Sequence, residues 1–516
     1  MKHRTLKIAL LFVILSALAL AQDEASFAKR VTVKKLANGL TIVICQRPEA
    51  PVFSFFTMVD AGSVQDPMEA TGLAHMFEHM AFKGTTGIGT TNYAEEKVAL
   101  EKVEATYAAY LTERDKTVGQ DPAKLQQLGR AWLEARDAAQ KFVVSNAFGK
   151  IVEQNGGEDM NAFTTYDETA YHYSLPENRF ELWAYLESER FLHPVLREFY
   201  KERDVVIEER RMRTDSNPFG RLLEQFTAVA FIAHPYHRPT VGWISDLNHF
   251  SATDAQHFFD KYYVPSNMVV AVAGDINPAQ AIPILEKYFG RLPARPHPDE
   301  TTTEEPPQNA ERIVVVKDPS QPIYIEGYHR PDYRSKDDAV FDAITDLLSE
   351  GRTSRLYRSL VRDKKIASFS EGFTGYPGVK YPHLFAFLAV PLPGHKPEEI
   401  GDAIHAEIDR LKKEDISDEE LKMIKTRSKA NLIRGLADNE GLATQLATYQ
   451  MRYGDWRELF RSVDRIDQVT KADIRRVANE VFIVTNRTVG YIENLRAGGS
   501  PGSDQNSNNS DQGGTQ

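Results

Sequence analysis

Cysteine is almost absent from this chain, since Cys45 is the only one among 516 residues. A single cysteine excludes disulfide bonds within the chain, so the fold must be held by its core, and a hydrophobic content of 42% is ample for one. Cys45 ends the apolar run 40–45, which is typical of a strand, so we expect a small packed side chain there. The length predicts two or more domains.

Basic residues are also in deficit. Lys and Arg number 62 against 73 Asp and Glu, which gives a formal net charge of −11. Binding to nucleic acid depends on contacts between basic side chains and phosphates. The acidic balance of this chain therefore excludes nucleic acid from the expected partners.

Long apolar runs are missing except for residues 8–20, near the N-terminus. This run is short for a membrane-spanning helix. It follows Lys2, Arg4 and Lys7 and ends in the small-residue sequence Ala-Leu-Ala, which is typical of a secretory signal peptide, residues 1–21. An uncleaved anchor is the alternative. Cleavage removes three basic residues and no acidic one, so the net charge becomes −14. We expect a periplasmic or secreted protein without a stable membrane anchor.

The rest of the chain divides at a polar stretch. Residues 296–308 contain four Pro, three Thr and three Glu, which predicts a linker between an N-terminal domain, 28–295, and a C-terminal domain, 309–495. Within the first domain, the charged stretch from about 94 to 154 is rich in Ala, Leu, Lys and Glu and predicts a helical hairpin insertion. The tail 496–516 is dominated by Gly, Ser, Asn and Gln, which predicts disorder.

One short motif carries the chemistry. Residues 75–79 read His-Met-Phe-Glu-His, and on a helix His75 and His79 project from one face toward a single metal ion. Zinc lowers the pKa of a bound water to about 7, and Glu78 lies close enough to act as the base that takes its proton. This order is the inverzincin signature. Because the motif lies in an apolar run, where unpaired ionisable groups are costly, we interpret it as a site for one zinc ion rather than as two solvated histidines.

A third protein ligand must lie elsewhere, because catalytic zinc usually takes three. In the predicted helix 198–214, Glu202 and Glu209 flank an apolar stripe, whereas Glu208 shares a face with charged residues. Glu189 continues the apolar stripe of the preceding helix. Periodicity leaves Glu189 and Glu209 as equal candidates.

The second half repeats the order of elements of the first. Strands at 313–316 and 323–328 precede a helix at 337–348, as strands precede the motif helix. When the two helices are aligned, the positions of His75, Glu78 and His79 are taken by residues none of which is histidine: Asp342, Thr345 and Asp346. The second half is therefore predicted to be a copy that keeps the architecture and has lost the metal.

These motifs resemble the insulinase/pitrilysin family of zinc metallopeptidases, in the short two-domain branch that includes mitochondrial processing peptidases and bacterial periplasmic homologues. The resemblance spans most of residues 30–490 and rests on the motif 75–79, Gly84-Thr85, Asn-Ala-Phe-Thr-Thr at 161–165 and Glu-Arg-Asp-Val-Val-Ile-Glu-Glu at 202–209. It implies an α+β fold of two homologous domains, each a mostly antiparallel sheet with helices packed on one face. The hairpin insertion belongs to the first domain.

The resemblance also implies roles for single residues. Glu209 is expected to be the third zinc ligand, and Glu202 is expected to orient a ligand histidine, with a surface ion pair as the alternative. Asn161 and Ala162 are expected on an edge strand beside the metal, where a peptide substrate adds as a further strand. The alternative for them is a plain core strand.

Two departures from the family pattern stand out. The gap between His79 and Glu209 is longer than usual, and the predicted hairpin accounts for the excess. The family holds substrate with an Arg followed seven residues later by a Tyr, and this chain has Arg362 but Phe369. The hydroxyl group is missing, so either the pair is dispensable or a partner supplies it. A plain surface arginine is the equal alternative for Arg362. The family also implies a homodimer, or a heterodimer with a similar metal-free chain.

The sequence therefore predicts an exported zinc-dependent endopeptidase that hydrolyses peptides or unfolded polypeptides. In this hypothesis His75, His79 and Glu209 hold the zinc, and Glu78 is the general base toward a metal-activated water. The alternative is a non-catalytic or partner-dependent subunit of a peptide-binding or assembly complex, because the family includes structural subunits.

Overall fold

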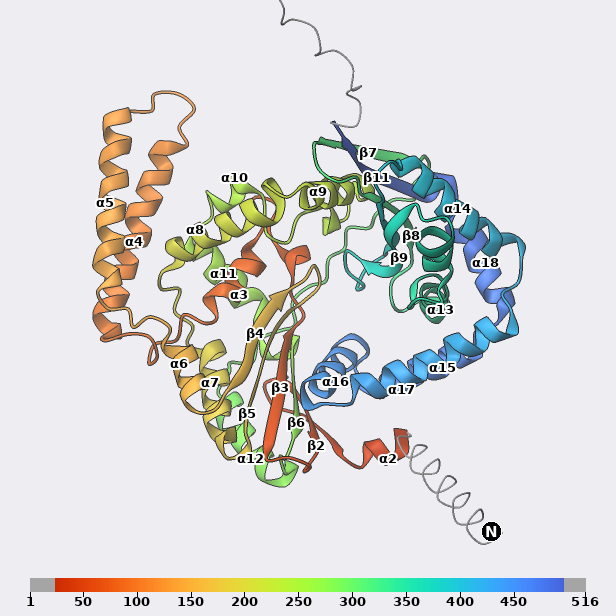
Figure 1. Ribbon diagram of the computed structural model, residues 1–516. Coiled ribbons are helices and arrows are strands. Elements are labelled where there is room, and N and C mark those ends of the chain that lie inside the picture. The colour runs from red at the N-terminus through yellow and green to blue at the C-terminus, as the bar shows by residue number, and fades with distance from the viewer. Residues whose placement is uncertain (1–23, 496–516) are drawn as a thin grey trace, which may run out of the picture.

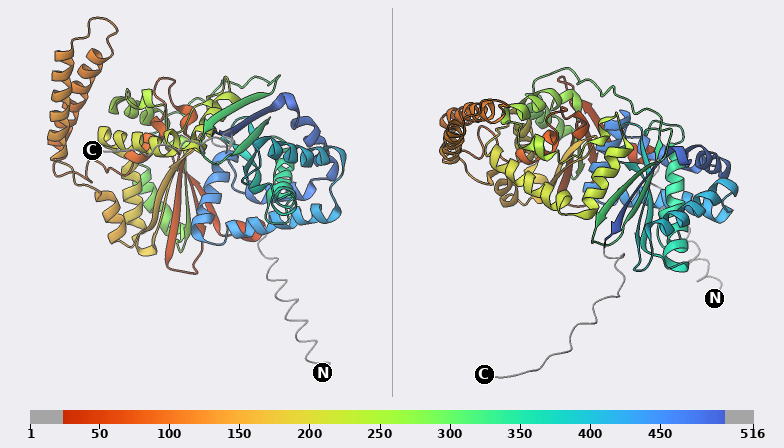
Figure 2. Two further views of the ribbon diagram at one scale, coloured as in Figure 1. Left: turned by 45° about the horizontal axis from the view of Figure 1, so that its top comes forward. Right: turned by 90° about the horizontal axis from the view of Figure 1, so that it is seen from above.

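The computed structural model describes residues 24–495, which are coloured in Figure 1. The signal peptide predicted at 1–21 and the tail predicted at 496–516 lie outside these residues. Within the described part of the chain, no helix has both the length and the apolar composition needed to cross a membrane. Two sheets, each with its own helices, lie side by side (Figure 2).

The first sheet takes its strands from both ends of the first half. Its order is β1-β2-β6-β3-β5-β4, and all neighbours are antiparallel except β2 and β6. The central strand β3 is buried from its second residue to its last, whereas β4 is an edge strand and largely exposed. The strands are β1 (Val31–Lys35), β2 (Thr41–Gln46), β3 (Val52–Val59), β4 (Glu158–Thr164), β5 (Thr169–Pro176) and β6 (Met268–Gly274).

Helices of the first half cover one face of this sheet. Trp183 is completely buried there and packs against Phe53 and Phe55 of β3, and the aliphatic side chains around them extend the same core. Aromatic side chains of this size bury about 150–250 Å² each, so they account for much of the core. The helices are α3 (Leu73–Met80), α6 (Ala147–Gln154), α7 (Phe180–Leu192), α8 (Phe199–Arg210), α10 (Ile244–Leu247), α11 (Ala252–Tyr262) and α12 (Pro278–Phe289).

The second half repeats this plan. Its sheet has the order β7-β11-β8-β10-β9, with only β7 and β11 parallel. The strands are β7 (Arg312–Asp318), β8 (Tyr324–Arg330), β9 (Ala367–Tyr376), β10 (His383–Pro391) and β11 (Arg487–Asn494). The helices are α13 (Asp338–Ser349), α14 (Pro397–Lys413), α15 (Asp418–Gly435), α17 (Glu458–Gln468) and α18 (Lys471–Val481).

Each half also lends one helix to the other. Helix α16 (Asn439–Tyr453) lies on the second face of the first sheet, where Leu446 joins a core with Phe56 and Met58 (Figure 1). Helix α9 (Pro218–Ala230) lies on the second sheet, where Phe226 joins Ile325 in a separate core. This exchange ties the halves into one unit. The short N-terminal helix α2 (Glu24–Ala28) packs against the same region as α16.

The predicted insertion is a two-helix hairpin that extends away from the first half (Figure 1). It consists of α4 (Tyr93–Arg114) and α5 (Pro122–Gln140). It is shorter than the predicted stretch 94–154 because α6 turns back onto the body, where Phe148 and Val152 are buried. The predicted fold class, two related α+β domains with a hairpin in the first, is confirmed.

Candidate active site

Helix α3 carries the His-x-x-Glu-His motif and is fixed at its N-terminus by a buried carboxylate. The two oxygens of Asp66 accept hydrogen bonds from the backbone N–H groups of Gly72 (2.7 Å) and Ala74 (2.9 Å). Backbone N–H groups at the start of a helix have no hydrogen-bond partner within the helix, and the carboxylate of Asp66 supplies one. Its negative charge also interacts favourably with the positive end of the helix dipole. The apolar residues Met76 and Phe77 anchor the other side of α3 in the core.

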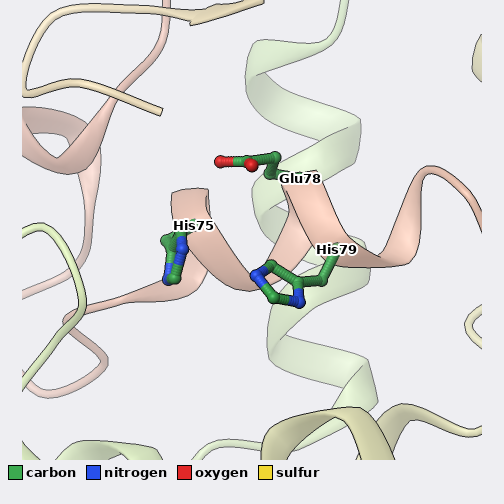
Figure 3. Close-up of side chains that lie close together, drawn as sticks. All are labelled: His75, Glu78 and His79. Carbon is green, nitrogen blue, oxygen red and sulfur yellow. The ribbon is translucent and has the colours of Figure 1, made fainter. Parts of the chain in front are cut away.

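The motif side chains lie together as predicted. One ligand atom from each of His75, Glu78 and His79 lies within 4.8 Å of the others. Figure 3 shows the two imidazole rings one turn apart on α3, with the Glu78 carboxylate beside them. His75 is buried, and His79 and Glu78 are half-buried.

Helix α8 brings Glu209 against both rings. Its Oε1 lies 3.6 Å from Nε2 of His75, and its Oε2 lies 3.4 Å from Nε2 of His79. Tetrahedral zinc with bonds of about 2.0–2.2 Å keeps its ligand atoms about 3.3–3.6 Å apart. Each imidazole nitrogen lies at this spacing from one oxygen of Glu209, so the two nitrogens and the carboxylate form a donor set suited to zinc. The exposed side chain of Arg213 lies 2.7 Å from Oε1 of Glu209.

Glu189, the other candidate from periodicity, is committed elsewhere. Its Oε2 lies 3.0 Å from Nδ1 of His193, and its Oε1 accepts a hydrogen bond from Arg291 at 2.7 Å. Glu189 therefore belongs to an ion-pair network at the C-terminal end of α7, away from the motif helix.

Glu202 contacts His79 on the side of the ring away from Glu209. Its Oε1 is 3.0 Å from Nδ1 of His79, and its Oε2 is 2.5 Å from the ammonium group of Lys83. Burial by itself would raise the pKa of Glu202, but the hydrogen bonds from His79 and Lys83 outweigh it and lower this pKa to about 2. Burial alone would lower the pKa of His79, but hydrogen bonds with Glu202 and Glu209 raise this pKa to about 9. With a metal ion on Nε2, the ionised Glu202 would hold the remaining proton of the ring on Nδ1. Among the described residues, Nδ1 of His75 has no such partner.

Glu78 points to the sheet side of the motif. The hydroxyl of Thr164, at the end of β4, donates a 2.6 Å hydrogen bond to Oε2 of Glu78. Burial raises the pKa of Glu78, and the bond from Thr164 opposes that rise. A carboxyl group whose pKa lies above its usual value is better matched to taking up a proton near neutral pH.

The edge strand β4 lies beside these groups. A cavity of about 490 Å³ is lined by Glu78 and His79 on one side and by Asn161 and Ala162 on the other. Ala162 pairs with Tyr171 of β5, so the outer edge of β4 is left without a neighbouring strand in the described structure. We call this space the catalytic cavity.

The substrate-holding pair expected in the second half lies on the surface. Arg362 is exposed and is paired with its neighbour Asp363 at 2.6 Å. Phe369 is 42% exposed on the edge strand β9. The structure therefore brings neither side chain into contact with the motif helix of its own chain.

The counterpart of the motif in the second half has a different chemistry. Asp342 and Asp346 line a cavity of about 290 Å³ on α13. Asp346 is paired with Arg427 at 3.1 Å, and burial raises the pKa of Asp342 to about 7. This position offers carboxylates but no imidazole.

Sequence reasoning did not identify Asp66, Lys83 and Thr164 as parts of the site. Thr164 lies in a stretch that carries the family resemblance and Lys83 directly precedes another, Gly84-Thr85, so their positions were a signal. Their partners, Glu202 and Glu78, are 119 and 86 residues away in sequence, and no local pattern predicts such pairs.

Two family models match this chain. The model described as Insulinase (Peptidase family M16) matches residues 41–129 and 139–242, and the model described as Peptidase M16 inactive domain matches residues 249–428. The interruption in the first match falls within α5 of the hairpin.

Similar proteins are found among bacterial proteases. The chain is 28% identical to the zinc protease PqqE of Helicobacter pylori, over 96% of this chain and 100% of that protein. The crystal structure of a protease from Helicobacter pylori matches with a TM-score of 0.74 and 28% identity, over 90% of this chain and 99% of that one. The periplasmic protease PqqL from Escherichia coli matches with a TM-score of 0.67 and 19% identity, over 93% of this chain but 48% of that one.

Proposed function

Because the chain belongs to the insulinase family of peptidases, family M16, we propose that it is a zinc-dependent endopeptidase acting on peptides or unfolded polypeptides. The observation that carries this proposal is the convergence of two imidazoles and a carboxylate from α3 and α8, with a second carboxylate beside them. Relatives of this chain are named zinc proteases.

In this proposal His75, His79 and Glu209 hold one zinc ion per chain. When bound, the metal supplies a Lewis acid that polarises the peptide carbonyl and makes a water molecule more acidic. Glu202 keeps His79 in the correct tautomer through its 3.0 Å contact with Nδ1. Lys83 in turn holds Glu202 in place.

Glu78 moves the proton. Thr164 holds Oε2, which leaves Oε1 to take a proton from the attacking water. The same oxygen then gives the proton to the amine of the departing peptide fragment, so that one carboxyl group serves both steps. The partly buried position of Glu78 raises its pKa above the usual value, which favours proton uptake by this carboxylate.

The substrate would bind as an added strand on β4. The edge at Asn161 and Ala162 has no neighbouring strand in the described structure, and the N–H of Ala162 donates to Oδ1 of Asn161. A peptide backbone would replace that side-chain contact, and backbone recognition tolerates many sequences. A folded protein does not offer an extended backbone of this kind, so we propose peptides and unfolded polypeptides as substrates.

We also propose how the protein assembles and where it is located. The related protease of Escherichia coli is about twice as long as the part that matches this chain, which supports pairing of this chain with itself or with a similar metal-free chain. Arg362 of one chain would then serve the site of another, which accounts for its distance from its own motif. The name of that relative and residues 1–21 together support export to the periplasm or beyond.

A second candidate is a non-catalytic or partner-dependent subunit. Phe369 in place of the expected tyrosine favours it, because a hydroxyl for holding substrate is missing. This candidate predicts that the purified chain alone cleaves nothing, whatever its metal content.

Metal analysis combined with turnover of a quenched-fluorescent peptide library tests the main proposal. We expect about one zinc per chain, lost in Glu209→Gln and kept in the matched control Glu189→Gln. Glu78→Gln should keep zinc and lose activity by about 10²- to 10⁴-fold, the usual contribution of a general base. Full turnover by Glu78→Gln would refute its role, and zinc-loaded but inactive wild type would support the subunit candidate.

A further inference from the structure

A second cavity lies next to the catalytic cavity, between the hairpin and α8. It measures about 880 Å³, within the range of about 300–1,000 Å³ typical of ligand pockets. Its walls come from α4 and α5 on one side, from the first turn of α8 on the other and from the start of α11 at the end. We call it the hairpin cavity.

The hairpin cavity and the catalytic cavity share part of their walls. Val143, Glu198 and Lys201 line both. Glu198 and Lys201 form an ion pair at 2.8 Å, so a paired charge stands at the boundary. The two cavities therefore adjoin at these residues, and a bound peptide would have to cross only this boundary to occupy both.

The distance between the cavities fits a peptide. Tyr200 in the hairpin cavity and Glu209 at the candidate metal site are nine positions apart on α8, which is about 14 Å along the helix. An extended peptide covers this distance in about four residues.

The chemistry of the walls selects an apolar occupant. Leu100, Val143, Leu196 and Phe199 provide apolar surface. Each of the three cations in the walls has an acidic neighbour within the protein. Lys97 lies near Glu101, Arg136 near Asp204 and Lys201 near Glu198. The walls therefore do not offer the group of free cations that an anionic ligand would need.

Tyr200 of the cavity wall belongs to an aromatic cluster that joins the hairpin to α8. The rings of Tyr107 and Tyr200 lie 4.4 Å apart and those of Trp132 and Tyr200 lie 5.4 Å apart. The buried guanidinium of Arg203 donates a hydrogen bond to the hydroxyl of Tyr107. These contacts fix the hairpin to α8, so the cavity exists before a ligand enters.

We propose that the hairpin cavity is a second binding site for the substrate, which takes an apolar stretch of the peptide about four residues from the bond that is cut. The inference rests on the proposed peptidase function, because it names the same substrate. It also gives the insertion a role: the hairpin makes the enzyme prefer peptides long enough to fill both cavities.

Two quenched-fluorescent peptides with the same central sequence test this. The short one has three residues on each side of the cut, and the long one has eight, with Leu and Phe in the added parts. We expect wild type to show a kcat/KM at least about tenfold higher for the long peptide, the effect of burying one apolar side chain. Leu100→Trp and Gln256→Trp, which fill the cavity from α4 and α11, should remove this preference. Lys102→Trp, exposed on the opposite face of α4, is the matched control and should keep it.

Binding to the Glu78→Gln protein separates this inference from the proposed function. Fluorescence anisotropy should show tighter binding of the long peptide, lost when Leu100→Trp or Gln256→Trp is added. Equal binding of both peptides to Glu78→Gln, or an unchanged preference in both cavity-filling variants, overturns the second site even if the peptidase activity stands. Length-dependent binding without any hydrolysis by wild type supports the cavity and overturns the peptidase proposal instead.

Discussion

Replacing Glu202 should weaken zinc binding without removing a ligand. In the native chain Glu202 accepts a hydrogen bond from Nδ1 of His79 and pairs with Lys83. Glu202→Ala removes the acceptor, so His79 loses the group that fixes its ring and its tautomer. Loss of such a partner typically weakens metal binding by about 10- to 100-fold.

Glu202→Gln should have a smaller effect, because the amide oxygen can still accept the bond from His79. A hydrogen bond to a charged group contributes about 1.5–3 kcal/mol and a neutral one about 0.5–1.5 kcal/mol. The difference of about 1–1.5 kcal/mol corresponds to about 5- to 13-fold in zinc affinity. We therefore expect the order wild type, Glu202→Gln, Glu202→Ala.

Competition with a chromophoric zinc chelator measures these affinities directly. Glu208→Gln is the matched control, because Glu208 lies on the same helix but is exposed and paired with Arg211. It should bind zinc like wild type. Equal affinities for Glu202→Ala and wild type would show that the contact with His79 does not orient the ligand. An equal loss in Glu208→Gln would show that only the net charge of α8 matters.

Three further predictions follow from other contacts. Arg197→Met should lower the free energy of unfolding by about 3–5 kcal/mol, because it leaves the buried carboxylate of Glu96 unpaired. Urea denaturation measures this loss, and a loss under about 1 kcal/mol would contradict the prediction. Burial lowers the pKa of His383 to about 3, so the folded state binds fewer protons than the unfolded state, and the stability that His383 contributes should be lost as pH falls from about 6.5 toward 3. In His383→Asn the melting temperature should therefore depend less on pH over that range. An unchanged dependence would be evidence against a buried neutral imidazole. Phe369→Tyr should raise kcat/KM for a peptide by about 2- to 13-fold if the hydroxyl gains one substrate hydrogen bond, and no change would show that the family's clamp is dispensable here.

Local patterns predicted the motif helix well. The four-residue spacing of His75 and His79 depends only on helix geometry, and the structure places both rings with Glu78 on one short helix. The fold class also followed from the family resemblance. Periodicity could not decide whether Glu189 or Glu209 is the third candidate zinc ligand, because both continue an apolar stripe. Only the packing of α8 against α3 distinguishes the two residues.

Features that depend on contacts between residues distant in the sequence could not be predicted from local patterns. The exchange of α9 and α16 between the halves gives each sheet a covered second face, and an amphipathic helix does not show which sheet it will cover. The end of the hairpin at Gln140 was missed for a related reason. Helix α6 is separated from α5 by only a few residues, and its burial on the body is a tertiary choice.

The hairpin and the candidate metal site form one mechanical unit. Arg197 donates hydrogen bonds to Glu96 on α4 and also to the backbone oxygens of Lys83, Thr85 and Ile88, in the loop that leaves the motif helix.

The side chain of Lys83 holds Glu202, which contacts His79. A shift of α4 is therefore passed through one guanidinium and one ammonium group to a proposed zinc ligand. Because buried groups of this kind are costly to leave unpaired, the loop cannot relax independently of the hairpin. An insertion that only added surface would not need a fully buried ion pair at its base, so this connection is itself an argument that the hairpin takes part in what the site does.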